Sequence, residues 1–181
     1  MGIIFDFSDK LDFADIDLTP PEKVIEEIAA QFEQATKGLV CVRIEGYDGH
    51  IFSYKQSFAG IANMFADKTK DYDIQNDLGK LGEETHKYEV CLYTPLYENY
   101  KFRVFFLKYG VASYPVTLVL EQSVAKSIKS SNYILSRDDR TGLECLVEKI
   151  LNSDAVLEIV QEMIRVNQIR REQTMASEDE I

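Results

Sequence analysis

Two histidines and several acidic residues are the groups of this 181-residue chain that could bind a metal or move a proton. Glu83 and His86 have the Glu-x-x-His spacing that places two side chains on one helical face in di-iron bundles. Those bundles need two copies of the motif and further carboxylates, whereas this chain has one copy. Asp48 lies close to His50, but a set of metal ligands there would depend on residues distant in the sequence. We therefore predict no metal site and no cofactor.

The common motifs of catalysis and nucleotide binding are missing from the sequence. No lysine has an acid two positions before it, as nuclease cores with Glu-x-Lys require, and GxxxxGK[ST], GxGxxG and GxSxG do not occur. A cysteine nucleophile paired with His50 or His86 is an open alternative. However, Cys41, Cys91 and Cys145 all lie in apolar segments, which favours inert, buried thiols. We predict that the chain is not an enzyme.

A polar cluster on one face of the predicted sheet is the remaining candidate for chemistry. Its bases alternate with Glu45 and Glu89 on predicted strands, so they lie side by side if the first hairpin joins the central sheet. A ladder of cross-strand ion pairs facing water is the favoured interpretation, and a site for an anion, an acidic peptide or a small ligand is the alternative. The residues of this alternative polar site are Arg43, Asp48, His50, Lys101 and Arg103.

The sheet itself is predicted by residues 88–121, where aromatic and β-branched residues alternate with polar ones. This pattern predicts three successive antiparallel strands, with a hairpin connection at residues 96–99 after Pro95. Val104 and Phe106 share the parity predicted to face a core, while Phe105 falls on a mixed second face.

Further strands are predicted on either side of this segment. Residues 40–54 form a hairpin with a turn at Asp48–Gly49, and His50, Phe52 and Tyr54 share a face of its return strand. A short strand is expected at residues 133–135.

Helices are predicted before and after the strands. Thr19 and Glu22 form a capping box that begins the first helix, and Gly38 ends it. A short helix follows at residues 123–130, and Thr141 and Ser153 are the expected caps of two final helices. Because so few residues separate this last pair, we predict a helical hairpin packed on the sheet or on another copy of the chain. Residues 57–86 carry a weak signal, with a short helix expected around Ile61, Met64 and Phe65.

Acidic residues concentrate at the two ends of the chain, which has a net charge of −11. Residues 1–37 contain nine acids and three bases, and residues 172–181 contain four acids and no base. Residues 1–18 predict an arm whose aromatics pack on the domain and whose aspartates bind a basic protein partner, with solubility as the alternative. These aspartates are Asp6, Asp9, Asp12, Asp15 and Asp17.

The overall prediction is a single α+β domain over residues 1–171 and a disordered acidic tail at 172–181. Its antiparallel sheet of about four to six strands packs one face against an N-terminal helix and a C-terminal helical hairpin. The absence of a basic stripe argues against direct nucleic-acid binding. Unpaired cysteines predict a reduced cytosolic protein, and no segment has the length or composition to span a membrane.

The function favoured by the sequence is a non-catalytic cytosolic protein-binding module, such as a bacterial accessory, immunity or inhibitor protein acting through acidic surfaces. The alternative is a small-ligand-binding protein or enzyme that uses the polar site on the sheet. A homodimer is compatible with either interpretation.

Overall fold

The computed structural model describes residues 19–51 and 84–178, with side chains described through residue 170. Its core element is a five-stranded antiparallel sheet, within the predicted four to six strands, and the strand order is β1-β2-β3-β4-β5. The strands are β1 Cys41–Gly46, β2 Thr85–Thr94, β3 Tyr97–Gly110, β4 Val116–Leu120 and β5 Ile134–Arg137. The predicted arm at residues 1–18, with its five aspartates, and the expected helix around Ile61 lie outside the described residues.

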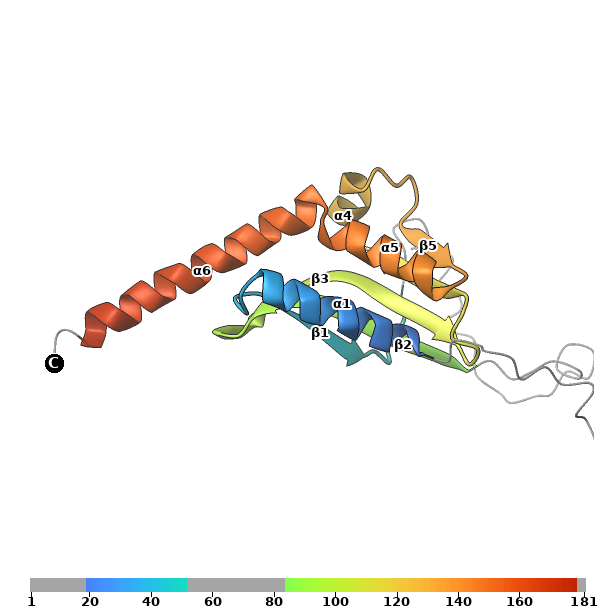
Figure 1. Cartoon of the computed structure of the whole chain (residues 1–181), viewed down its shortest axis with the longest axis horizontal. Helices are drawn as coiled ribbons and strands as arrows, with labels where there is room; N and C mark the ends of the chain where they lie inside the picture. Colours follow the sequence, from blue (N-terminus) through green and yellow to red (C-terminus); the bar gives the residue numbers. More distant parts are fainter. Residues whose placement is uncertain (1–18, 52–83, 179–181) are drawn as a thin grey trace, which may run out of the picture.

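Four helices accompany the sheet in the described part of the chain (Figure 1). Two of them, α1 and α5, contribute Val24, Ile25, Leu143 and Val147 to the same buried cluster as the sheet residue Leu92. The helices therefore cover one face of the sheet, which confirms the α+β fold predicted from the sequence. The helices are α1 Pro21–Ala35, α4 Gln122–Ser127, α5 Arg140–Leu151 and α6 Asp154–Glu178.

A β-bulge in β3 changes which residues face the core. Val90 on β2 pairs with Phe105, but the next residue, Cys91, pairs with Arg103, so Val104 is the extra residue of β3. Val104 and Phe105 are consequently both buried. Simple alternation predicts Phe106 in the core and Phe105 on the mixed face; the bulge reverses both placements, and Phe106 contacts Arg103 on the outer face.

Within the described part of the chain, β1 pairs with β2. Six residues of β1 pair with Tyr88–Tyr93 of β2. Residues 47–51 are not in a strand, and the predicted return-strand residues Phe52 and Tyr54 lie outside the described residues. The predicted β2–β3 hairpin is present, although its turn is Pro95–Leu96.

Different residues from those predicted cap the helices. The N-cap of α1 is Pro20, whose side chain has no group that could accept a hydrogen bond. The predicted capping residue Glu22 accepts a hydrogen bond from the Tyr109 hydroxyl at 2.5 Å. Asp139 caps α5 by accepting from the Gly142 N–H. Gly38 does end α1: it adopts a φ of 70°, which favours glycine, and its N–H bonds to the Glu33 carbonyl.

The long helix α6 is anchored to the sheet by its buried residues. Asn167 accepts a hydrogen bond from Thr94 at 2.6 Å and donates one to the Leu39 carbonyl at 2.7 Å. Ser153, predicted as the cap of this helix, is buried, and its hydroxyl makes no hydrogen bond within the described residues. Arg170 of the same helix still lies over the ring of Tyr97 on β3, at 4.4 Å. The helix continues to Glu178, past the predicted boundary at Arg171 (Figure 1).

Candidate functional site

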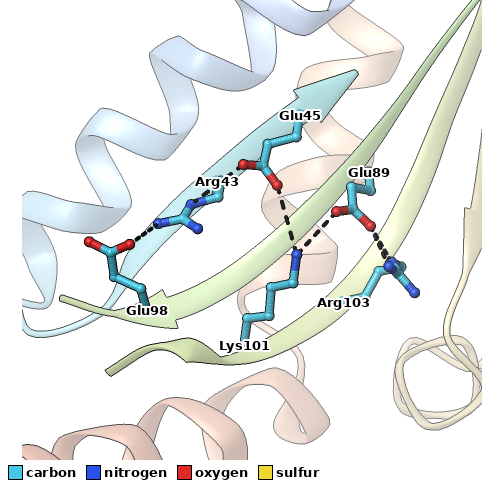
Figure 2. A network of polar contacts seen from close by, with 6 residues as sticks. All are labelled: Arg43, Glu45, Glu89, Glu98, Lys101 and Arg103. Atoms are coloured by element: carbon cyan, nitrogen blue, oxygen red, sulfur yellow. Dashed lines mark hydrogen bonds and ion pairs between the residues drawn. The ribbon is translucent and has the colours of Figure 1, made fainter. Parts of the chain in front are cut away.

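The predicted polar cluster is assembled on the outer face of β1, β2 and β3 (Figure 2). At its centre, Glu89 accepts a hydrogen bond from Arg103 Nε at 2.7 Å and one from Lys101 Nζ at 3.2 Å. Although burial raises the pKa of the Glu89 carboxyl, these hydrogen bonds and the two positive charges outweigh that effect and hold the pKa below its ordinary value. Glu89 is therefore a fixed negative charge, not a proton donor or acceptor at neutral pH.

The cluster continues toward β1 through longer ion pairs. Lys101 Nζ lies 3.8 Å from a carboxylate oxygen of Glu45. The guanidinium of Arg43 lies 4.0 Å from a carboxylate oxygen of Glu45 through Nε, and 3.8 Å from one of Glu98 through Nη2. Each of the three bases thus contacts at least one glutamate (Figure 2). We call this set of six residues the polar network, which comprises Arg43, Glu45, Glu89, Glu98, Lys101 and Arg103.

Cys91 lies beneath the polar network. Its neighbours across the two strand pairs are Arg43 on β1 and Arg103 on β3. Cys91 is 1% exposed, and burial is the main cause that raises the pKa of its thiol. The predicted burial is therefore confirmed for Cys91, but Cys41 is partly exposed and Cys145 is exposed on α5.

Aromatic rings hold the two arginines against the sheet. The Arg43 guanidinium lies 4.2 Å from the centre of the Tyr93 ring, and that of Arg103 lies 5.0 Å from the Phe106 ring. Phe106 in turn packs against Tyr47, with ring centres 4.8 Å apart. Stacking and ion pairing restrict both arginines, so the network is rigid and already neutralised.

Asp48 and His50 do not join the polar network in the described contacts. They lie in the segment that follows β1, where the Lys87 ammonium donates to the Gly49 carbonyl at 2.7 Å. Asp48 lines a shallow cavity together with His86, whereas Arg103 lines another one with Glu121. The structure thus brings Arg43, Lys101 and Arg103 together and leaves the other two predicted members apart.

The Glu83–His86 spacing does not fall on a helix. His86 lies near the start of β2, with its ring stacked on Tyr109 at 5.0 Å, and Glu83 is outside the described residues. Within the described part of the chain, no group of three or more His, Cys, Asp or Glu side chains is arranged to hold a metal ion.

A second candidate site is an open groove between α1 and α5, with a volume of about 520 Å³. Its floor is apolar, because Ile28 and Phe32 pack against the core from α1 and Leu151 is buried on α5. Polar side chains form the rim. We call this site the acidic groove, which is lined by Glu27, Ile28, Gln31, Phe32, Ala35, Arg140, Glu144, Glu148, Leu151 and Asn152.

The rim of the acidic groove has an excess of negative charge. Arg140 bridges the two helices, with its guanidinium 2.7 Å from Glu27 on α1 and 2.7 Å from Glu144 on α5. Glu148 is exposed one turn further along α5. The groove therefore contains three carboxylates and one guanidinium, a net charge of −2 (one minus three). A partner that fits it presents apolar side chains flanked by positive charges.

Sequence reasoning missed the acidic groove, although a signal for it exists. Arg140, Glu144 and Glu148 are four residues apart, so they form one row along α5 beside its buried stripe. Glu27 occupies the equivalent border of the apolar stripe of α1. What the sequence does not reveal is that these two rows face each other.

The described helices, from α1 to α6, include none with the length and apolar character needed to cross a bilayer. Searches with protein-family models, among curated proteins and among solved structures found no match to this chain.

Proposed function

We propose that this chain is a non-catalytic, cytosolic protein-binding module whose acidic groove receives a basic, amphipathic helix of a partner protein. The observation that carries the proposal is the combination of an apolar floor with a rim of net charge −2. An amphipathic helix binds such a groove through apolar residues at positions i, i+3, i+4 and i+7, and flanking lysines or arginines meet the carboxylates.

The excess negative charge of the rim favours recognition of a basic partner more than it stabilises the fold. Glu27 and Glu144 share the single guanidinium of Arg140, and Glu148 adds a further carboxylate. Unbalanced charges at the edge of an interface raise the association rate of an oppositely charged partner and exclude partners of the same sign. The free cysteines Cys41, Cys91 and Cys145 support a reducing compartment.

The alternative function, a small-ligand or catalytic site on the sheet, has less support. It relies on the clustering of Arg43, Lys101 and Arg103, yet three glutamates already neutralise these bases. An anion would have to displace Glu89 from its hydrogen bonds with Lys101 and Arg103 before it could bind. Membership of a bacterial accessory, immunity or inhibitor class stays a prediction from the sequence, as does partner binding by the N-terminal aspartates.

Affinity capture with three forms of the chain tests the proposal. The wild type, a groove variant (Gln31→Lys with Glu148→Lys) and a network variant (Lys101→Gln) serve as bait in lysate of the source cells, and mass spectrometry identifies the captured proteins. We expect one protein to bind the wild type and the network variant but not the groove variant. Its affinity is then measured by calorimetry with purified components.

The same three baits can also contradict the proposal. A partner lost with Lys101→Gln and retained by the groove variant would transfer the function to the sheet. Circular dichroism of all three baits establishes that they are equally folded, since each substitution is at an exposed or half-exposed position of the rim or network.

A further inference from the structure

An open pocket of about 390 Å³ lies where α4, β5 and α5 meet (Figure 1). Three basic residues from three segments line it, and no acidic residue of the described chain does. In a chain of net charge −11, a pocket lined by bases alone is a local reversal of charge. We call this site the basic pocket, which comprises the bases Lys129, Arg137 and Lys149 and the apolar residues Ile128, Leu135 and Leu146.

The three bases of the basic pocket form no ion pair within the described residues, in contrast to those of the polar network. Arg137 donates from Nη1 to the Ser136 carbonyl at 2.6 Å, which leaves the other N–H groups of its guanidinium for a ligand. Asp139 precedes α5, but its carboxylate accepts from the Gly142 N–H at 2.6 Å as the cap of that helix. The described chain therefore does not neutralise the positive charge of the pocket.

Regular backbone structure positions each of these bases. The Lys129 N–H donates to the Lys126 carbonyl at 2.9 Å where α4 ends, and Lys129 adopts a φ of 58°. Because the Ser130 N–H also bonds back into α4, this ending is a Schellman motif. Arg137 is the last residue of β5, and Lys149 lies in the last turn of α5. The three cations thus converge on one pocket from fixed backbone positions.

The charge and the apolar residues of the basic pocket together indicate the class of ligand. A phosphate monoester has nearly two negative charges and three acceptor oxygens at neutral pH, whereas a carboxylate has one charge. Two lysines and the planar fork of Arg137 suit such a group, since a guanidinium binds phosphate through two parallel hydrogen bonds. Ile128 and Leu146 are buried and Leu135 is half-buried, so an apolar organic part attached to the phosphate has a surface to contact.

From these features we infer that the basic pocket binds a small, soluble phosphate monoester whose organic part is apolar. A volume of about 390 Å³ is in the range of small-molecule sites. A phospholipid headgroup offers the same chemistry, but the net charge of −11 opposes approach to an anionic membrane surface. The ligand is therefore assigned to the soluble source.

Titration of the isotope-labelled full chain with three probes tests the site by NMR. We expect phenyl phosphate to shift the backbone amides of Gly142, Cys145 and Lys149, which line the pocket, until they saturate. Inorganic phosphate should bind more weakly, and phenol should not bind. Phenyl phosphate that leaves these amides unshifted, or phenol that shifts them equally, would overturn the inference. No partner protein is present, so the result is independent of binding at the acidic groove.

Three charge-removing variants separate the pocket from general attraction by a basic surface. Arg137→Gln should weaken the binding of phenyl phosphate about tenfold, because it removes a charge-assisted contact through two hydrogen bonds. Lys149→Gln, at an exposed position, should weaken it severalfold. The matched control is Lys126→Gln, which removes the same charge from an exposed position of α4 outside the pocket and should bind as the wild type does. Unchanged binding by both pocket variants, or an equal loss with Lys126→Gln, would overturn the inference.

Cys145 provides a second readout, because its exposed thiol lines the same pocket. Phenyl phosphate should slow the alkylation of Cys145 by iodoacetamide severalfold and leave that of the partly exposed Cys41 on β1 unchanged. Mass spectrometry of the peptides measures both rates. Equal rates for Cys145 with and without phenyl phosphate would contradict binding at this pocket.

Sedimentation with vesicles of phosphatidic acid distinguishes the two sources of the phosphate. We expect the full chain to stay in solution, because its overall negative charge opposes binding to the vesicles. Binding to the vesicles that Arg137→Gln abolishes would assign the pocket to a lipid headgroup and overturn the soluble ligand.

Discussion

The polar network and the acidic groove both place charged side chains over a hydrophobic layer, but they differ in charge balance. The network has three bases and three acids, connected by ion pairs across β1, β2 and β3. The groove has three acids and one base, on two helices. In a cluster with equal numbers of acids and bases the charges neutralise one another. A cluster with an excess of one charge attracts a partner of the opposite charge. From this difference we propose a structural role for the polar network and a binding role for the acidic groove.

The bulge in β3 places Phe105 in the core and Phe106 on the outer face, beside the polar network. Substitution of each phenylalanine tests this assignment and has the largest expected effect. Phe105→Ala should lower the free energy of unfolding by about 3–5 kcal/mol, because the ring is 1% exposed. Phe106→Ala removes a partly exposed ring on the outer face and should lower the free energy of unfolding by a distinctly smaller amount. Chemical denaturation of both variants measures the difference. Equal losses would mean that both rings belong to the core and that the outer face is misassigned.

Glu89→Gln should cost about 1–3 kcal/mol at neutral pH, because two cations lose their shared carboxylate in a nearly buried position. The pKa of Glu89 is lowered in the native state from an ordinary value of 4.5, so its contribution is present above about that pH. The contribution is lost as the pH falls through the native pKa.

Denaturation curves at a series of pH values measure this dependence. The gap in stability between the wild type and Glu89→Gln should be largest near neutral pH and should narrow below about pH 4. Lys101→Gln is the matched control, with a smaller cost because the Lys101 side chain is 36% exposed. A gap that is constant with pH would show that the charge of Glu89 has no stabilising role.

Arg140→Gln tests the acidic groove, the second region of the comparison. It removes ion pairs to Glu27 and Glu144, whose side chains are 58% and 40% exposed, so the expected cost is less than about 1 kcal/mol. The same change makes the groove more negative and should increase affinity for a basic helix. Weaker binding by a fully folded variant would indicate that Arg140 itself contacts the partner.

Glu148→Gln should have the smallest effect on folding, within about 0.5 kcal/mol, because the residue is exposed and away from the core. Its effect should appear in the association rate with the partner, and more strongly at low salt. Stopped-flow measurements over a salt series provide the test. An unchanged rate and salt dependence would remove Glu148 from the binding surface.

The sequence predicts the sheet well because alternation is a local property. The strands around Leu92 and Leu118, the short helix after Glu121 and the final strand near Leu135 all appear where the pattern places them. The clustering of Arg43, Lys101 and Arg103 follows from the same alternation once β1 pairs with β2.

The errors arise where distant residues decide the structure. The bulge at Val104 has no signature of its own in the sequence. The mixture of charged and apolar residues on the second face predicted for β3 is the one sign of the change in register. Glu22 satisfies the capping pattern but bonds to Tyr109 on β3, which local sequence cannot reveal. The groove likewise depends on how α1 and α5 pack, because neither row of charged residues is distinctive by itself.

The most direct test of the account maps the binding surface by NMR. Isotope-labelled protein is titrated with the partner identified by affinity capture, and changes in backbone amide shifts are followed. We predict that the shifted amides concentrate in α1 and α5, around Glu27, Phe32 and Glu148, while those around Glu89 and Lys101 remain unchanged. Shifts concentrated on β1, β2 and β3 over the polar network would contradict the account and assign the function to the sheet.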